Sequence, residues 1–322
     1  MREALFIKKN KERWQRIQQG VTGDADELAS EFTRLIDDLS YAKTFYPSSR
    51  VTNYVNSLAS RIYLHIYRNR KEKTNRLVDF WRYDLPLIIR KHHRVIGLST
   101  LIFLVFAAVG FFTAARDEQV LNEILGQDYV EMTQRNIRNG NPFGVYEGDN
   151  VFIMWLRIML NNIGVGVKAF VSGLFAGIPT LYILVSNSFM VGGFDQLFYR
   201  EGLGFDFFLV VFVHGTLELT AIILACAAGL VLGKGFLLPG TLGRLASLKN
   251  AAKEGTKIII GLFPIFGLAA FFEGFVTRLY NDVPILTILV VVASIVFVVW
   301  YFIIYPFRIE KKLADKFWEE RT

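Results

Sequence analysis

The stretch VIGLSTLIFLVFAAVGFFTAA, residues 95–115, contains no charged side chain. A helix of this length rises about 30 Å at ~1.5 Å per residue, which matches the hydrocarbon thickness of a bilayer. Similar apolar segments occur at 206–233, 256–275 and 284–305. The chain is therefore predicted to be all-α, a polytopic transmembrane helical bundle.

The segment 151–194 is apolar overall but allows two interpretations. It is either one long span with an amphipathic beginning, or a tight helical hairpin that turns near Ser172 and Gly173. Polar residues and a proline interrupt it: Arg157, Asn161, Asn162, Lys168 and Pro179. With this segment included, the sequence predicts five apolar segments that make five or six crossings.

The first 94 residues have a different composition, with 19 Lys or Arg and 11 Asp or Glu. Apolar side chains recur at three- and four-residue spacing over 25–45 and 50–68, which predicts two amphipathic helices paired around a turn. Aromatic residues after Phe80 lead into the basic run RKHHR at 90–94. That arrangement is typical of an interfacial elbow that leads into a membrane span.

Charge asymmetry predicts the orientation in the membrane. The loop 116–150 holds seven acidic and three basic residues, so the positive-inside rule predicts that it is exported and that the N-terminus is cytoplasmic. The expected domains are a soluble helical region at 1–94, a bundle at 95–306 and a charged tail at 307–322. Five crossings would place the basic loop 234–257 and the tail outside, and six would place both inside, so the side of the C-terminus stays open.

Composition also narrows the class of partner. Of the 36 Lys and Arg residues, 19 lie before the first long apolar span, where anionic lipid headgroups are the nearer partner. We expect a lipid bilayer and no nucleic acid. The single cysteine, Cys226, excludes an intrachain disulfide and a CxxC metal site. No phosphate loop, dinucleotide fingerprint or nucleophile elbow occurs. Whether the protein is an enzyme stays open, and the few polar groups beside a large soluble region favour a non-enzymatic role.

Ionisable residues inside the apolar segments are the candidate functional residues, because a charge at the bilayer centre costs roughly 3 kcal/mol or more. His214 and Glu218 are four residues apart, on one face of a helix. Glu273 lies near the end of the following segment. The predicted intramembrane polar site also includes three uncharged polar residues: Asn162, Asn187 and Thr277.

Three interpretations of His214, Glu218 and Glu273 stay open. They form a hydrogen-bonded clamp that holds helices in register, or a proton- or ion-linked pathway, since a histidine beside a carboxylate can titrate near neutral pH. The third is a metal site with one nitrogen and two oxygen ligands, although the second histidine of an HExxH motif is missing. The cofactor is left unassigned.

Small residues at four-residue spacing predict close contacts between helices. Gly173 and Gly177 form one such pair, and Gly229 and Gly233 form another. Spacing of this kind lets two helix backbones approach each other within a membrane.

The stretch HGTLEL at 214–219, continued by AIILACAAGLVLG at 221–233, resembles the most recognisable segment of the stage II sporulation protein M family. FVSGLFAGIPT at 170–180, with Asn187 beyond it, resembles the preceding segment of that family. Glu273 stands where the family tends to keep an acid. The extra N-terminal region resembles longer members from bacteria that do not sporulate.

This resemblance implies a multi-pass protein of the bacterial inner membrane. It also implies a scaffold or assembly partner for envelope proteins in cell-wall remodelling, with a homo-oligomer possible. Two alternatives remain: a transporter or channel-like component that uses the His and Glu residues, and an intramembrane metal-dependent hydrolase. A transporter predicts a water-accessible cavity that reaches His214 and Glu218.

Overall fold

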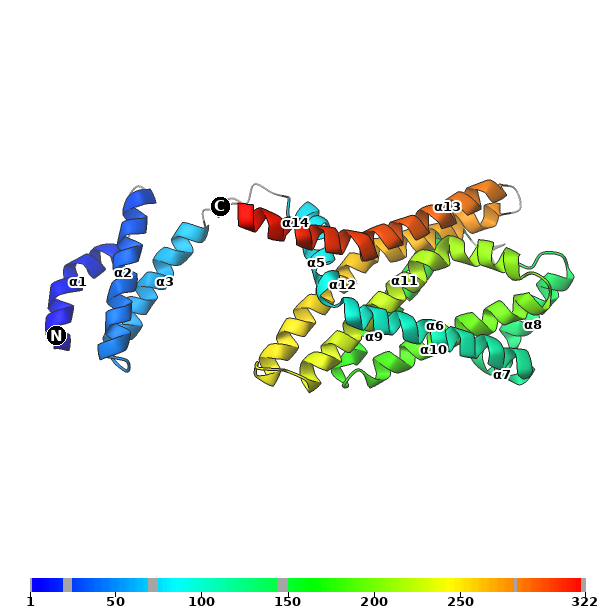
Figure 1. Cartoon of the computed structure of the whole chain (residues 1–322), viewed down its shortest axis with the longest axis horizontal. Coiled ribbons are helices and arrows are strands. Elements are labelled where there is room, and N and C mark those ends of the chain that lie inside the picture. The colour runs from blue at the N-terminus through cyan, green and yellow to red at the C-terminus, as the bar shows by residue number, and fades with distance from the viewer. Residues whose placement is uncertain (1, 20–24, 69–74, 144–149, 281–282, 320–322) are drawn as a thin grey trace. The chain divides into compact units, whose positions relative to one another are not determined.

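The computed structural model describes residues 2–19, 25–68, 75–143, 150–280 and 283–319, and every regular element in these ranges is a helix. This confirms the predicted all-α class. Contacts divide the chain into two compact units, Met1–Asn75 and Arg76–Thr322. Figure 1 shows each unit, and they are described separately below.

In its described residues, the N-terminal unit has three helices, α1 (Glu3–Gln19), α2 (Ala25–Phe45) and α3 (Arg50–Arg68). Its core contains Leu35 and Val55, both with no exposed surface. The indole Nε1 of Trp14 donates to Asp38 Oδ2 at 2.8 Å, and this carboxylate also pairs with Arg13 of α1. The unit therefore has its own hydrophobic core and its own polar contacts between α1 and α2.

The second unit begins with short helices and continues into a bundle. Its elements in chain order are α4 (Arg76–Asp79), the π-helical turn η1 (Phe80–Asp84), α5 (Leu85–Lys91), α6 (His93–Arg116), α7 (Glu118–Leu125), α8 (Gln127–Arg138), α9 (Val151–Val171), the 3₁₀ turn η3 (Ser172–Leu174), α10 (Ile178–Arg200), α11 (Gly204–Leu237), α12 (Arg244–Phe271), the π-helical turn η4 (Phe272–Val276), the 3₁₀ turn η5 (Thr277–Leu279), α13 (Pro284–Val298), the π-helical turn η6 (Val299–Ile304) and α14 (Tyr305–Glu319).

Within the described residues, five helices are long and apolar enough to cross a membrane. They are α6, α9 with η3, α11, α12 with η4, and α13 continued through η6 into α14. These five agree with the five predicted apolar segments. The chain is thus a multi-pass membrane protein in a lipid bilayer.

The segment 151–194 folds as the helical hairpin, not as one long span. The chain reverses between α9 and α10, where Ala176 and Gly177 take positive φ values of 57° and 79°. Pro179 then occupies the first turn of α10, a position where its missing N–H leaves no hydrogen bond unmade. The 23 residues of α10 rise about 34 Å, and α10 packs beside α6 in the bundle (Figure 1).

Two ion pairs and one histidine–carboxylate contact join the basic elements at one end of the bundle. Lys257 of α12 pairs with Asp84, His92 Nε2 lies 2.7 Å from Glu254 Oε2, and Arg90 Nε lies 2.7 Å from Glu310 Oε2 of α14. The elbow, the first half of α12 and the C-terminal helix therefore share this end of the bundle.

The elbow belongs to the membrane unit because it is part of the bundle core. Leu85 and Ile89 of α5 are 0% and 2% exposed and join the same core cluster as α11 and α12. The compact unit therefore begins at Arg76, and the expected boundary at residue 94 lies inside it.

The opposite end of the bundle is covered by two helices formed from the region 116–150. Leu121 of α7 and Val130 of α8 pack with Leu197 and Phe207, which lie at the ends of α10 and α11. Tyr280 donates to the Asp206 carboxylate at the same end. As a result, α7 and α8 lie directly over the membrane helices near the polar residues described next.

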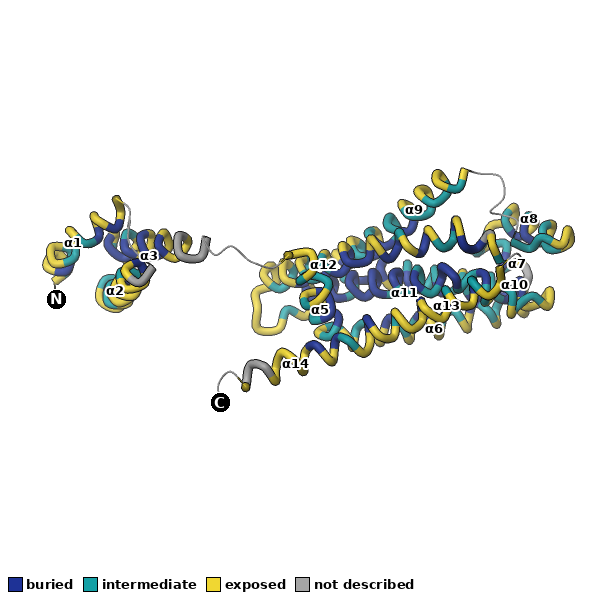
Figure 2. Tube along the Cα trace, turned by 90° about the horizontal axis from the view of Figure 1, so that it is seen from above, coloured by how far each residue is buried: buried dark blue, intermediate teal, exposed yellow. Residues whose placement is uncertain are grey.

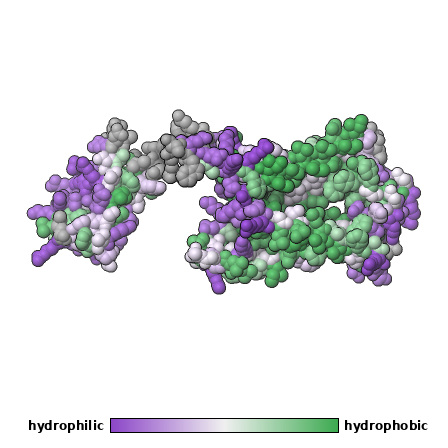
Figure 3. Space-filling model, viewed as in Figure 1, coloured by the Kyte–Doolittle hydropathy of each residue, from purple (hydrophilic) through white to green (hydrophobic). Residues whose placement is uncertain are grey.

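The helix α11 is the central element of the bundle. It contacts α6, α9, α10, α12 and α13. Of the residues in its most apolar 18-residue stretch, 50% are buried, compared with 17% in the corresponding stretch of α6. Figure 2 shows α11 as mainly buried, and Figure 3 shows the outer surface of the bundle as a broad hydrophobic area. His214, at 8% exposure, therefore lies on a face of α11 that packs against other helices.

Candidate functional site

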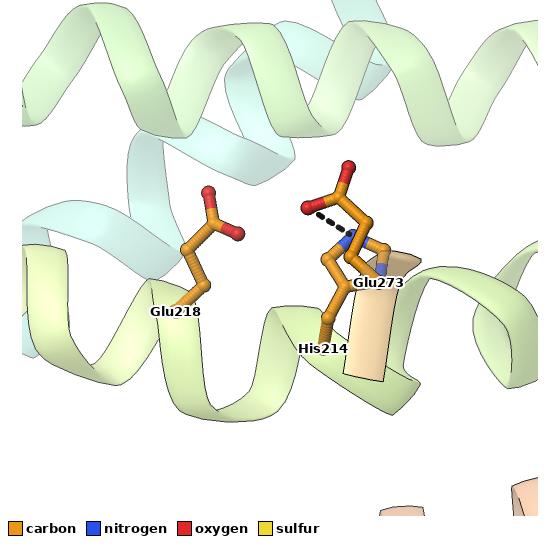
Figure 4. Close-up of side chains that lie close together, drawn as sticks. All are labelled: His214, Glu218 and Glu273. Atoms are coloured by element: carbon orange, nitrogen blue, oxygen red, sulfur yellow. Dashed lines mark ion pairs between the residues drawn. The ribbon is translucent and has the colours of Figure 1, made fainter. Parts of the chain in front are cut away.

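His214, Glu218 and Glu273 lie together inside the bundle, and we call them the His–Glu cluster. His214 and Glu218 are one turn apart on α11, and Glu273 reaches them from η4, as Figure 4 shows. His214 Nε2 lies 4.0 Å from Glu273 Oε2. One nitrogen or oxygen atom from each residue lies within 4.8 Å of the other two.

The π-helical turn η4 sets the position of Glu273. A π-helical turn inserts extra backbone into a helix, which rotates the following side chains relative to an uninterrupted α-helix. Trp155 of α9 packs beside Gly274 of this turn, and its indole Nε1 donates to Gly267 O at 3.1 Å. Helix α9 thus packs against the π-helical turn that follows α12 and stabilises it.

Asn162 of α9 is the fourth member of the arrangement. It is 7% exposed and lines the same cavity as Glu218, close to that carboxylate. The amide of Asn161 donates to Asn162 Oδ1 at 3.3 Å, so the Asn162 amide nitrogen is the group of this side chain that can donate to a carboxylate. Two consecutive asparagines therefore lie beside one carboxylate of the cluster.

Two cavities meet at the His–Glu cluster. The first has a volume of about 350 Å³ and is lined by the cluster, by Tyr129 and Asn187, and by apolar side chains of α7, α10 and α11. The second, of about 360 Å³, is lined by the cluster and by Arg157, Ile158, Asn161 and Asn162 of α9. The cluster therefore forms a wall common to both cavities.

Tyr129 of α8 is a site residue that sequence reasoning missed. Burial raises the pKa of its phenol above the ordinary value, and the nearby Glu273 carboxylate raises this pKa further. The phenol thus stays protonated and remains a hydrogen-bond donor at neutral pH. The amphipathic spacing of 127–138 is the signal that could identify it, but the acidic composition of 116–150 indicates only an exported loop.

Two of the predicted polar residues have local partners. Asn187 lines the first cavity, but its amide donates to Ile183 O of its own helix at 2.8 Å. Thr277 is 3% exposed, and its hydroxyl donates to Phe272 O at 3.2 Å. This hydrogen bond stabilises the π-helical turn. The structure brings Asn162 to the cluster, places Asn187 on the cavity wall, and leaves Thr277 outside both linings.

The four predicted packing glycines lie where the turn between α9 and α10 crosses α11. A Cβ atom on Gly173 would lie 2.8 Å from Gly229 Cα, and one on Gly233 would lie 2.7 Å from Gly177 N. Thr180 of α10 donates to Ala169 O at 2.7 Å across the same contact. This close crossing fixes α9, which carries Asn162, against α11, which carries His214 and Glu218.

Fold and site together define a polytopic helical membrane protein with a buried His–Glu cluster between two cavities. A family model described as Stage II sporulation protein M matches residues 99–278, more than half of the chain. The chain belongs to this family, which confirms the resemblance. The match contains the whole His–Glu cluster, and a second model, described as a domain of unknown function (DUF8413), matches residues 4–68 of the N-terminal unit.

The chain is also similar to a curated archaeal relative. This is "Uncharacterized protein MJ0706" of Methanocaldococcus jannaschii, 24% identical over 203 residues, which cover 61% of this chain and 88% of the relative. No solved structure matches the chain. The similarity therefore supports the membrane bundle as a shared unit and brings no activity with it.

Proposed function

We propose that this protein is a membrane transport component that takes up a cation at the His–Glu cluster and passes it between the two cavities. The observation that carries the proposal is the common wall: His214, Glu218 and Glu273 line the cavity below α7 and α8 and also the cavity beside α9. A cluster that served only as a clamp between helices would need no cavity on either side.

Electrostatics explains why the cluster would attract a cation. Glu218 and Glu273 are close enough to repel each other when both are ionised, and repulsion between charges grows as the local dielectric constant falls. A proton or a metal ion between them removes this repulsion. Each cavity is large enough for several waters at roughly 30 Å³ each, so an ion beside the cluster would keep part of its hydration.

The orientation that we propose follows from the charges at the two ends. The end that holds the elbow, the basic loop between α11 and α12, and α14 lies in the cytoplasm together with the N-terminal unit, and α7 and α8 lie outside. The positive-inside rule supports this choice. The proposed location is the inner membrane of a bacterial cell.

Ion flux in proteoliposomes tests the transport proposal. Vesicles that contain the full chain and a trapped pH dye, or a trapped metal-sensitive dye, are driven by a potassium diffusion potential. We expect the wild type to move protons or divalent metal ions, and Glu218→Gln and Glu273→Gln to lower the rate at least about 10-fold, because each removes an intramembrane ionisable group.

Glu310→Gln is the matched control, because Glu310 pairs with Arg90 at the far end of the bundle and is half exposed. Its rate should equal that of the wild type. Equal rates in Glu218→Gln and the wild type, or wild-type vesicles with no flux of either ion, would overturn the proposal.

A second candidate is a scaffold or assembly partner in envelope and cell-wall remodelling. The observation that favours it is the N-terminal unit, which has its own core and its own family model. A separately folded unit joined to a membrane bundle suits docking of other envelope proteins or of a second copy of the chain.

Crosslinking in cells tests the scaffold. The full chain should recover cell-wall hydrolases or other envelope proteins that a chain without residues 1–75 does not recover. Identical recovery by both chains, after equal membrane insertion has been verified, would contradict a docking role for this unit.

A further inference from the structure

We propose that the cation of the His–Glu cluster is a divalent transition-metal ion of the Zn²⁺ type, held by His214, Glu218 and Glu273. This inference rests on the proposed function for its site, and it specifies the chemical class of the cation that the site binds. The ligand set is one imidazole nitrogen and two carboxylate oxygens from three side chains. A fourth coordination position would face a cavity.

The distances fit a single ion after a small adjustment. The ligand atoms lie within 4.8 Å of one another, and the nearest pair named above, His214 Nε2 and Glu273 Oε2, is 4.0 Å apart. Around a tetrahedral ion with bonds of about 2.0–2.2 Å, neighbouring ligand atoms lie roughly 3.3–3.6 Å apart. Closing the cluster by about 1 Å needs only side-chain rotation, and the adjoining cavities provide room for it.

The imidazole of His214 is not committed to a structural hydrogen bond. The residue is 8% exposed, and its Nδ1 atom has no hydrogen-bond partner among the described residues. A buried polar atom of this kind calls for a physical explanation, because buried nitrogen atoms nearly always have a partner. Because no hydrogen bond from the described residues fixes this ring, either of its nitrogens can turn toward an ion that lies between the two carboxylates.

Asn162 and Asn161 act as outer partners of the proposed site. Asn162 lines the cavity beside Glu218, and Asn161 donates a hydrogen bond to Asn162. Partners of this kind fix the orientation of a ligating carboxylate and tune metal affinity. A bare pair of carboxylates would not need such a chain of amides.

The nitrogen ligand selects the class of ion. Mg²⁺ and Ca²⁺ prefer six or more oxygen ligands, many of them water or carbonyl groups. Imidazole suits Zn²⁺, Co²⁺ and related ions. A divalent ion between two carboxylates also gives a cluster with no net charge, which favours its burial in the bundle.

Metal binding to the full chain in detergent tests the inference. The protein is stripped with a chelator, equilibrated with Zn²⁺ or with Co²⁺ as a spectroscopic probe, desalted and measured by elemental analysis. We expect about one ion per chain and a visible Co²⁺ spectrum of a low-coordinate site. His214→Gln, Glu218→Gln and Glu273→Gln should each weaken binding at least about 100-fold, and Asn162→Ala about 10–100-fold.

His92→Gln is the matched control, because His92 forms its own histidine–carboxylate contact with Glu254 away from the cluster. It should bind metal as the wild type does. Gel filtration and thermal melting of each metal-free variant verify the fold. Metal binding that survives His214→Gln, or a wild type that retains no ion, would overturn the inference.

The outcomes separate this inference from the proposed function. Proton flux by a protein that binds no metal overturns the metal site and leaves transport standing. Stoichiometric metal binding without any flux supports the metal site and overturns transport.

Discussion

Replacing Gly229 with leucine is expected to prevent the membrane bundle from assembling. A Cβ atom at this position would clash with the backbone oxygen of Ala169 and would lie 2.7 Å from Thr180 Oγ1. These two atoms hydrogen-bond to each other, so the leucine would also break the contact between α9 and α10. Overpacking by side-chain atoms typically costs about 1–3 kcal/mol, and a clash with backbone is expected to exceed that range.

Thermal melting and gel filtration in detergent measure this effect, with Gly164→Leu as the control. Gly164 lies on α9, and a Cβ atom there has nothing within 4 Å. Leucine has a higher helix propensity than glycine, so the control should melt at the wild-type temperature or above it. Equal melting of Gly229→Leu and Gly164→Leu would show that α9, α10 and α11 do not cross as closely as described.

The spans and the N-terminal helices could be predicted from sequence because they depend on local pattern. The predicted ranges 25–45 and 50–68 coincide with α2 and α3, since apolar spacing directly reports the buried face of an amphipathic helix. The hairpin of α9 and α10 could not be decided in this way. Hydropathy reports length and polarity but not chain direction, and the reversal depends on the positive φ values of Ala176 and Gly177.

The site was predictable only where one helix carries it. His214 and Glu218 share a face of α11 by their spacing alone. The approach of Glu273 depends on the π-helical turn after α12, which no helical periodicity predicts. Tyr129 reaches the cavity because α8 folds over the bundle, and such a tertiary contact has no local sequence pattern. The hydroxyl of Thr277 does not face the cavities because it donates to a backbone oxygen of the same π-helical turn.

Replacing Leu35 with aspartate is expected to unfold the N-terminal unit and leave the membrane bundle intact. Leu35 has no exposed surface in the core of α1, α2 and α3, and a buried, unpaired carboxylate costs several kcal/mol. A unit of this size has a stability of roughly 4–11 kcal/mol at about 0.05–0.15 kcal/mol per residue, and small domains lie low in that range. The main core cluster of the bundle contains only residues after Asp79, so the substitution removes none of its contacts.

Ile36→Asp separates burial from the helix propensity of aspartate, because Ile36 is the next residue of the same helix and is 39% exposed. It should keep the unit folded. Limited proteolysis of the full chain in detergent measures the difference: Leu35→Asp should be cut rapidly within residues 2–68, whereas Ile36→Asp should resist as the wild type does, and the bundle should persist in both. Equal cleavage of the two variants would mean that α2 does not bury the face that contains Leu35. Loss of the bundle in Leu35→Asp would mean that the two units fold as one, and a docking unit could not then be removed or exchanged without disturbing the His–Glu cluster.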